Sequence, residues 1–169
     1  MTQLQRFRGQ LLLLLLSLVG VGISIYLTAV HYENVPLVCS ASGIVDCARV
    51  LSSPFSVIPG TTIPISIPGL GWCLAFAVLA AIGWRSVSLQ RRVRIAQFLL
   101  ALVGMVTALY LVYVELVRLH TICAWCTALH VIILIIFLIT LAQLQQPHDE
   151  PEPASADEPR PLTSARNQQ

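Results

Sequence analysis

Long apolar segments alternate with polar stretches along this chain of 169 residues. Four of these segments lack Asp, Glu, Lys and Arg altogether, and they cover residues 11–30, 69–84, 95–114 and 122–144. About 20 helical residues cross the hydrocarbon core of a bilayer, where a backbone must satisfy its own hydrogen bonds. The segments show no period-two alternation and contain no proline, which excludes barrel strands. The pattern predicts an all-α membrane protein, a four-helix transmembrane bundle with an extended outer loop, residues 32–68, between its first two helices.

Composition excludes both a soluble globule and a chain that is disordered throughout. Hydrophobic residues make up 56% of the sequence and charged residues 11%, whereas a soluble domain carries about 25% charged residues. Disorder needs low hydrophobicity and high charge, and only residues 147–169 have that balance. We therefore expect a membrane domain over residues 1–146 and a disordered tail after it.

The placement of arginine predicts the orientation of the bundle, because the sequence has no lysine. Arg6 and Arg8 precede the first segment, and four more arginines lie between the second and third segments, whereas the opposite side holds only Arg49 and Arg118. Positive residues stay in the cytoplasm, so both termini are predicted to be cytoplasmic and the long loop to face outward. The first apolar run exceeds the core of a signal peptide, about 7–15 residues, which favours an uncleaved anchor.

Four of the five cysteines form two pairs at the predicted outer face, where disulfides persist. Cys39 and Cys47 lie in the long loop, and Cys123 and Cys126 form a CxxC motif at the start of the fourth segment. The N-terminus of a helix favours the thiolate, which is the reacting form of cysteine. His130 follows one turn deeper on the same face, and an ionisable side chain in a membrane interior indicates function. The two pairs together suggest a relay by thiol–disulfide exchange.

Simpler interpretations of the cysteines are also compatible with the sequence. Cys123 and Cys126 could be small residues packed at a helix interface, and Cys39 and Cys47 could form a permanent loop disulfide. The four cysteines could also bind zinc, although the first spacing is wide for such a site. The fifth, Cys73, has no partner and is interpreted as a packed small residue.

Other classes of membrane protein are also compatible with the segments. A non-catalytic protein with a disulfide-stapled loop would not depend on Cys123 or Cys126. A transporter would need polar groups across the spans, and only His130 and Glu115 are candidates. His130 alone could bond a neighbouring helix, and Glu115 reads more simply as an ion pair with Arg118 at the outer boundary.

The order of the motifs resembles the vitamin K epoxide reductase family over residues 11–144. Four spans carry the resemblance, together with the Cys39-x7-Cys47 pair, the following Arg49-Val50-Leu51-Ser52-Ser53, and Cys123-Ala124-Trp125-Cys126. Another family of quinone-linked disulfide generators has the opposite order, with its CxxC in the first outer loop.

The resemblance implies a role for six residues. Cys123 and Cys126 match the active-site pair, in which Cys126 faces the quinone and Cys123 exchanges with the loop. Cys47 is then the partner of Cys123, and Cys39 the target of an outside protein. Ser53 matches a loop hydroxyl that supports the active site. His130 takes the place of a tyrosine of the vitamin K branch and is expected to bond a quinone oxygen, whereas the substrate-contacting asparagine of that branch has no counterpart near residues 64–73.

The implied activity is that of a membrane thiol–disulfide oxidoreductase that supports disulfide-bond formation. Electrons would pass from a separate thioredoxin-fold thiol oxidase of the periplasm or lumen to a quinone of the menaquinone, ubiquinone, plastoquinone or phylloquinone type, without metal or nucleic acid. The tail is too short for a fused thioredoxin-like domain, and the absence of lysine favours the bacterial inner membrane or the thylakoid membrane. Reduction of a vitamin K-type quinone or its epoxide by external thiols is the alternative.

Overall fold

The computed structural model describes residues 3–33, 39, 43–85 and 90–145. Four helices in these ranges are long and apolar enough to cross a membrane. They are α1 (Gln3–Glu33), α3 (Ser66–Arg85), α4 (Gln90–Tyr113) and α5 (Ala124–Gln145). The described residues form no strand, so the predicted all-α membrane bundle is confirmed. The predicted tail, residues 147–169, lies outside the described residues, as do positions 34–38 and 40–42 of the predicted loop.

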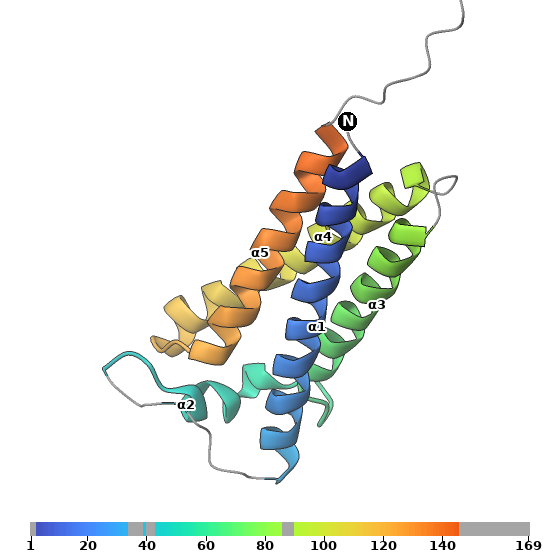
Figure 1. Ribbon diagram of the computed structural model, residues 1–169. Coiled ribbons are helices and arrows are strands. Elements are labelled where there is room, and N and C mark those ends of the chain that lie inside the picture. Colours follow the sequence, from blue (N-terminus) through green and yellow to red (C-terminus); the bar gives the residue numbers. More distant parts are fainter. Residues whose placement is uncertain (1–2, 34–38, 40–42, 86–89, 146–169) are drawn as a thin grey trace, which may run out of the picture.

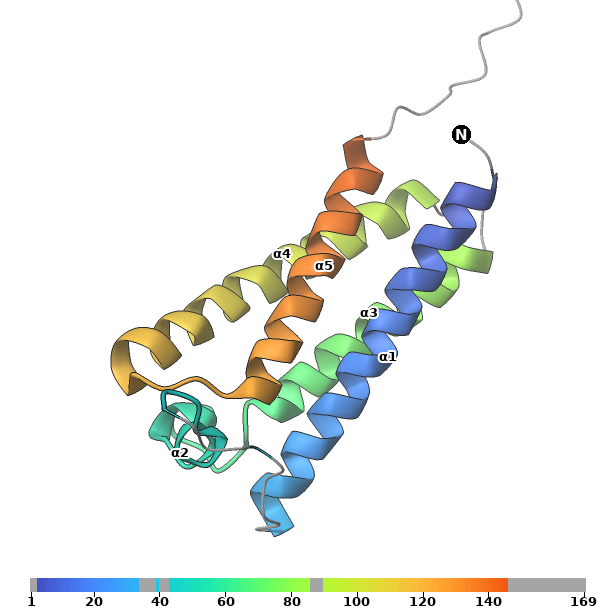
Figure 2. The same ribbon diagram turned by 60° about the vertical axis from the view of Figure 1, so that its left-hand side comes forward.

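The four long helices form a ring in which each packs against two others. α1 packs on α3 and α5, and α4 packs on the same two helices. Figures 1 and 2 show the helices side by side, with a short helix, α2 (Cys47–Leu51), at the end opposite the N-terminus. The connection between α4 and α5 lies at the same end as α2, so the segments that carry the two cysteine pairs meet there.

Hydrophobic side chains cover the outside of the bundle as well as its core. Val103, Val106 and Leu109 follow one face of α4 and are each about 60% exposed, at 60%, 61% and 61%. The core between the helices is built from Leu13, Phe76, Ala80, Ala101, Ile132 and Ile136. An exterior this apolar suits lipid, which explains why the helices lack the polar face of a soluble bundle.

Three glutamines join the helices at the end opposite α2. Gln10 of α1 and Gln97 of α4 exchange two hydrogen bonds, at 3.4 Å from Gln10 Nε2 to Gln97 Oε1 and 3.0 Å in reverse. Gln10 Nε2 also donates to Gln143 of α5, at 3.2 Å. Amides that bond across helices satisfy each other where lipid offers no partner.

The segment between α1 and α3 folds over the end of the bundle instead of extending away from it. After α2, a 3-10 turn, η1 (Pro54–Ser56), leads into a bend at Gly60, whose φ is +80°. Thr61 N–H donates to the Ile58 carbonyl at 3.0 Å, which closes a Pro59-Gly60 turn of the type that needs a positive φ at its third position. Ile65 N–H then bonds the Ser56 carbonyl at 2.9 Å and returns the chain to α3.

Candidate active site

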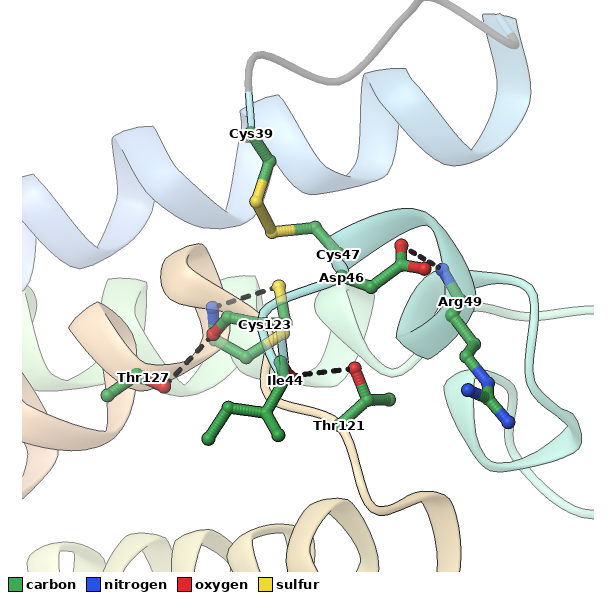
Figure 3. Close-up of a disulfide and its surroundings, with 9 residues drawn as sticks. Cys39, Ile44, Asp46, Cys47, Arg49, Thr121, Cys123 and Thr127 are labelled. Carbon is green, nitrogen blue, oxygen red and sulfur yellow. Dashed lines mark hydrogen bonds between the residues drawn. A yellow bond between two sulfur atoms is a disulfide. The ribbon is translucent and has the colours of Figure 1, made fainter. Parts of the chain in front are cut away.

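A backbone pairing fixes the loop onto the segment that precedes the CxxC motif. Ile122 N–H donates to the Ile44 carbonyl at 2.9 Å, and Asp46 N–H donates to the Ile122 carbonyl at 3.1 Å. The Thr121 hydroxyl donates a second hydrogen bond to the Ile44 carbonyl, at 3.0 Å (Figure 3). Thr121 and Ile44 are 77 positions apart in the sequence, and these bonds place them side by side. The predicted fourth span therefore starts two residues late, at Ala124, because Ile122 is occupied by this pairing.

Asp46 starts the short helix α2 and sets the position of Cys47. Its carboxylate accepts the Arg49 N–H at 3.0 Å, which caps the helix, while its own N–H is bonded to Ile122. Cys47, the first residue of α2, is 1% exposed and forms a disulfide with Cys39 (Figure 3). The pair Cys39 and Cys47, which the sequence analysis selected in the loop, is therefore joined by a disulfide bond.

The CxxC motif lies at the start of α5 with both thiols free. Cys123 is fully buried, and its Sγ accepts the N–H of Cys126 at 3.4 Å, the bond expected of a residue at the N-cap of a helix. A hydrogen bond from the Cys126 thiol, together with the N–H groups of Cys126 and Trp125, lowers the pKa of the Cys123 thiol. Burial and the Glu115 charge oppose this shift. Cys123 is thus the more acidic nucleophile of the pair.

Cys47 and Cys123 belong to one buried cluster that also contains Val50. Cys39, Trp125 and Cys126 pack against this cluster from its sides. In Figure 3 the Cys123 sulfur lies on the side of its residue that faces the loop disulfide. The structure thus brings all four paired cysteines together at one end of the bundle and keeps water from the two central ones.

A cavity of about 310 Å³ opens on the other side of the CxxC motif. Cys126, His130 and Ser53 line it, along with apolar side chains of α3 and α4. His130 Nδ1 is buried and has no hydrogen-bond partner among the described residues. The Ser53 hydroxyl donates to the Val50 carbonyl at 2.7 Å and supports the turn after α2. A mostly apolar pocket with a few polar groups is typical of a binding site for a small apolar ligand.

The expected ion pair between Glu115 and Arg118 is wrong. α4 continues into a π-helix, η2 (Val114–Leu119), where a simple turn was expected. Glu115 is 6% exposed, and its carboxylate accepts the Cys123 N–H and shares the single S–H proton of Cys126 with the Cys123 sulfur, whereas Arg118 is exposed. The wider π turn buries Glu115 directly after buried Val114, which the apolar pattern of the sequence did not reveal.

Sequence reasoning missed Glu115 as a site residue, although one signal pointed to it. It is the acidic residue that directly follows the third apolar segment, eight positions before Cys123, and the rule that drew attention to His130 applied to it equally. Trp72 was also missed: its indole N–H donates to the Leu100 carbonyl at 2.9 Å and its ring lines the cavity.

The surroundings of Cys73 and of the loop cysteines bear on two of the interpretations left open by the sequence. Cys73 is 1% exposed in the contact between α1 and α3, where a Cβ on Gly20 would lie 2.7 Å from its Sγ. That position fits the packed small residue expected from the sequence. Within the described ranges, no group of three His, Cys, Asp or Glu side chains is arranged to bind a metal ion. Cys39 and Cys47 form a disulfide with each other.

Comparison with known proteins identifies a family. The family model described as vitamin K epoxide reductase family matches residues 11–141 of the chain. No curated protein matches the sequence. The matched residues include the four long helices almost completely, the capping segment between α1 and α3, and all five cysteines.

Proposed function

The chain belongs to the vitamin K epoxide reductase family, and from this premise we propose that it carries electrons from an external dithiol protein to a membrane quinone. The family makes it a membrane thiol–disulfide oxidoreductase linked to quinones. The proposal adds the path: first the Cys39–Cys47 pair, then Cys123–Cys126, then the quinone. The net result is a disulfide in a secreted protein.

The proposal rests on one observation: the CxxC motif lies between the loop cysteines and an apolar cavity. On one side, Cys123 shares a buried cluster with Cys47. On the other side, Cys126 lines the apolar cavity with His130. A relay needs this arrangement, because one sulfur of the motif must meet the loop and the other the electron acceptor.

The first transfer is an exchange between the two pairs. The Cys47 thiolate attacks Cys123 of an oxidised CxxC, which breaks the Cys123–Cys126 bond and leaves the Cys126 sulfur as a thiolate. Cys39 then attacks Cys47, which forms the loop disulfide and releases Cys123. The described state, a loop disulfide beside two free CxxC thiols, is the product of this transfer. The lowered pKa of Cys123 supports its role, since a more acidic thiol is the better leaving group.

The second transfer oxidises the CxxC pair. A quinone supplies a two-electron acceptor that is soluble in the bilayer. Cys126 lines the cavity and would deliver the electron pair as the Cys123–Cys126 disulfide forms again. The unpaired Nδ1 of His130 is a polar group on this cavity that can bond a quinone oxygen. Ser53 keeps the loop turn in place at the rim.

The proposal also includes a partner and a membrane, which the distribution of arginines and cysteines supports. We place both termini in the cytoplasm and the cysteine end of the bundle on the outer side, on the strength of the arginine distribution. In this orientation Cys39 is reached by a thioredoxin-fold thiol oxidase of the periplasm or lumen. The bacterial inner membrane and the thylakoid membrane both offer this partner and a quinone pool.

Steady-state quinone reduction by the purified protein tests the proposal. A reduced thioredoxin-fold protein serves as donor, and menadione and a short-chain ubiquinone serve as acceptors. We expect Cys126→Ala to abolish quinone reduction, and His130→Leu to raise the KM for the quinone about tenfold, as for loss of one buried hydrogen bond of about 1.4 kcal/mol. Leu109→Ala, at an exposed residue of α4 that does not line the cavity, is the control and keeps its activity. Full activity in Cys126→Ala would refute the proposal.

A further inference from the structure

Glu115 is a buried carboxylate that the two-pair relay does not use. It is 6% exposed, at the last turn of the third span. Its backbone carbonyl accepts the N–H groups of both His120 and Thr121, the latter at 3.1 Å, so the π turn that holds Glu115 is closed on itself. A buried carboxylate is costly unless its partners stabilise it, and it therefore marks a functional position.

The hydrogen bonds of Glu115 lead to the reacting cysteines. Its side chain accepts the backbone N–H of Cys123 and competes with the Cys123 sulfur for the single S–H proton of Cys126. No ion pair joins it to an arginine in the described part of the chain, and Arg118 on the same turn is exposed. Glu115 also lines the cavity next to Cys126. One carboxylate therefore contacts both a thiol that must lose a proton and the space where the electron acceptor would bind.

We propose that Glu115 is a further catalytic residue, the base that takes the proton of Cys126 and delivers it to the quinone cavity. The inference rests on the function proposed above and adds the route of a proton to it. The alternative is that Glu115 serves only as a cap of α5 through its bond to the Cys123 N–H.

The oxidation of the CxxC pair transfers two electrons and two protons to the quinone. Cys123 enters as a thiolate, and Cys126 loses its S–H proton to the Glu115 carboxylate. An S–S bond forms between the two sulfurs, and the two electrons released reduce the quinone to a hydroquinone, which needs two protons. Glu115 gives one proton and returns to the carboxylate form. Solvent supplies the second, which replaces the proton that the loop dithiol lost when Cys47 attacked as a thiolate.

Few other groups near the cavity can exchange a proton in this step. Besides Glu115, the titratable side chains that line it are Cys126 and His130 from α5, His31 from α1 and Cys73 from α3. Of these side chains, only the Cys126 thiol is hydrogen-bonded to the Glu115 carboxylate. Glu115 is the only carboxylate among the residues that line the cavity in the described part of the chain.

Single-turnover oxidation of the prereduced protein by menadione, followed from pH 5.5 to 9, separates the two roles. Glu115→Gln keeps an oxygen that accepts the Cys123 N–H but cannot take a proton. We expect it to slow hydroquinone formation about 100-fold at neutral pH, in line with loss of a general base. Its rate should rise steeply with pH as hydroxide removes the Cys126 proton instead, whereas Glu115→Asp should recover part of the wild-type rate and profile.

Two controls make the result specific. Glu33→Gln removes an exposed carboxylate at the end of α1 and should react with menadione like the wild type. The rate at which dithiothreitol reduces the Cys39–Cys47 disulfide should stay within about twofold of wild type in Glu115→Gln, because the base acts only at the second transfer.

The outcomes distinguish the inference from the function beneath it. A Glu115→Gln protein that reduces menadione at the wild-type rate and with the wild-type pH profile would overturn the role of Glu115 and leave the relay intact. A variant that slows equally at every pH and melts at a lower temperature would show a cap only, and would also overturn it. If the prereduced wild type reduces neither menadione nor ubiquinone-1, the proposed function itself fails.

Discussion

The backbone of Ile122 is hydrogen-bonded to the backbone of Ile44, at 2.9 Å from nitrogen to oxygen. Each of these residues lies three positions or fewer before a cysteine, Cys123 in one case and Cys47 in the other. The bond therefore sets the register between the two redox pairs, and the Asp46 bond to Ile122 fixes it from the other side. Contact between Cys47 and Cys123 is a consequence of this short pairing and does not depend on a flexible loop finding its target.

A mixed disulfide between Cys47 and Cys123 should accumulate when their usual partners are removed. In the variant Cys39→Ala/Cys126→Ala, the two remaining sulfurs share one buried cluster and have no resolving thiol. Mass spectrometry of proteolytic fragments after mild oxidation should find this bond in most molecules. The matched variant Cys47→Ala/Cys123→Ala leaves Cys39 and Cys126, and a comparable yield of that pair would contradict the assigned order.

The Cys123 thiol should remain reactive at a lower pH than an ordinary cysteine. A lowered pKa keeps the thiolate present as pH falls, so alkylation of Cys123 by iodoacetamide should reach half its maximum rate below pH of about 8.5. Cys126→Ala removes the largest cause of the shift and should move the midpoint upward, whereas Cys126→Ser keeps a hydroxyl donor and should retain most of it. Equal midpoints in all three proteins would exclude the Cys126 bond as the cause.

The sequence was sufficient to predict the membrane bundle, because lipid makes the apolar segments long and free of charge. Each predicted segment lies in a longer helical stretch, for example residues 69–84 within Ser66–Arg85 and residues 95–114 within Arg91–Leu119, except at the start of α5. At the start of α5, the backbone of Ile122 bonds Ile44, which lies 78 positions earlier in the chain. An isoleucine side chain gives no sign of such a bond, because the bond depends on where the distant segment lies.

The sequence was sufficient to select the four paired cysteines of the candidate site, but it was less informative about the residues that surround them. Cys39, Cys47, Cys123 and Cys126 were identified by spacing, and the structure brings them together. Glu115 was misassigned because an acidic residue beside an arginine on a helix is usually an exposed pair, and the π turn that directs it inward has no sequence signature. Burial of His130 on the cavity agreed with the expectation from its distance to Cys126, and its role stays a prediction.

Gly104→Ala should weaken quinone binding without affecting disulfide exchange. A Cβ at this position would lie 2.6 Å from Cζ2 of Trp72, which is too close. The Trp72 ring would have to move away from α4, and its hydrogen bond to the Leu100 carbonyl would break. Overpacking of this kind costs about 1–3 kcal/mol, and because Trp72 lines the cavity we expect the KM for menadione to rise about tenfold or more. Gly22→Ala, where nothing lies within 4 Å of the new Cβ, is the control and should keep the wild-type KM.

Gln97→Leu should destabilise the bundle and leave the redox site unchanged. It removes both hydrogen bonds to Gln10, and an interhelical bond in a membrane contributes about 0.6 kcal/mol. The loss of about 1 kcal/mol corresponds to a Tm lower by about 2–4 °C for a chain of this size. Thermal unfolding in detergent measures it, with the lipid-facing Leu109→Ala as a control that should change the Tm much less. An unchanged Tm in Gln97→Leu would mean that the glutamine bonds add no stability.

The amount of hydroquinone formed by the prereduced protein in the absence of any donor tests the relay most directly. Two dithiol pairs that both drain to the quinone yield about two hydroquinones per wild-type protein. Cys47→Ala should yield about one, because only the CxxC pair is left, and Cys126→Ala should yield none, because the loop pair has no other route. Hydroquinone formation by Cys126→Ala at the wild-type yield, or a yield of about one from the wild type, would contradict the path from the loop through Cys123 and Cys126 to the quinone.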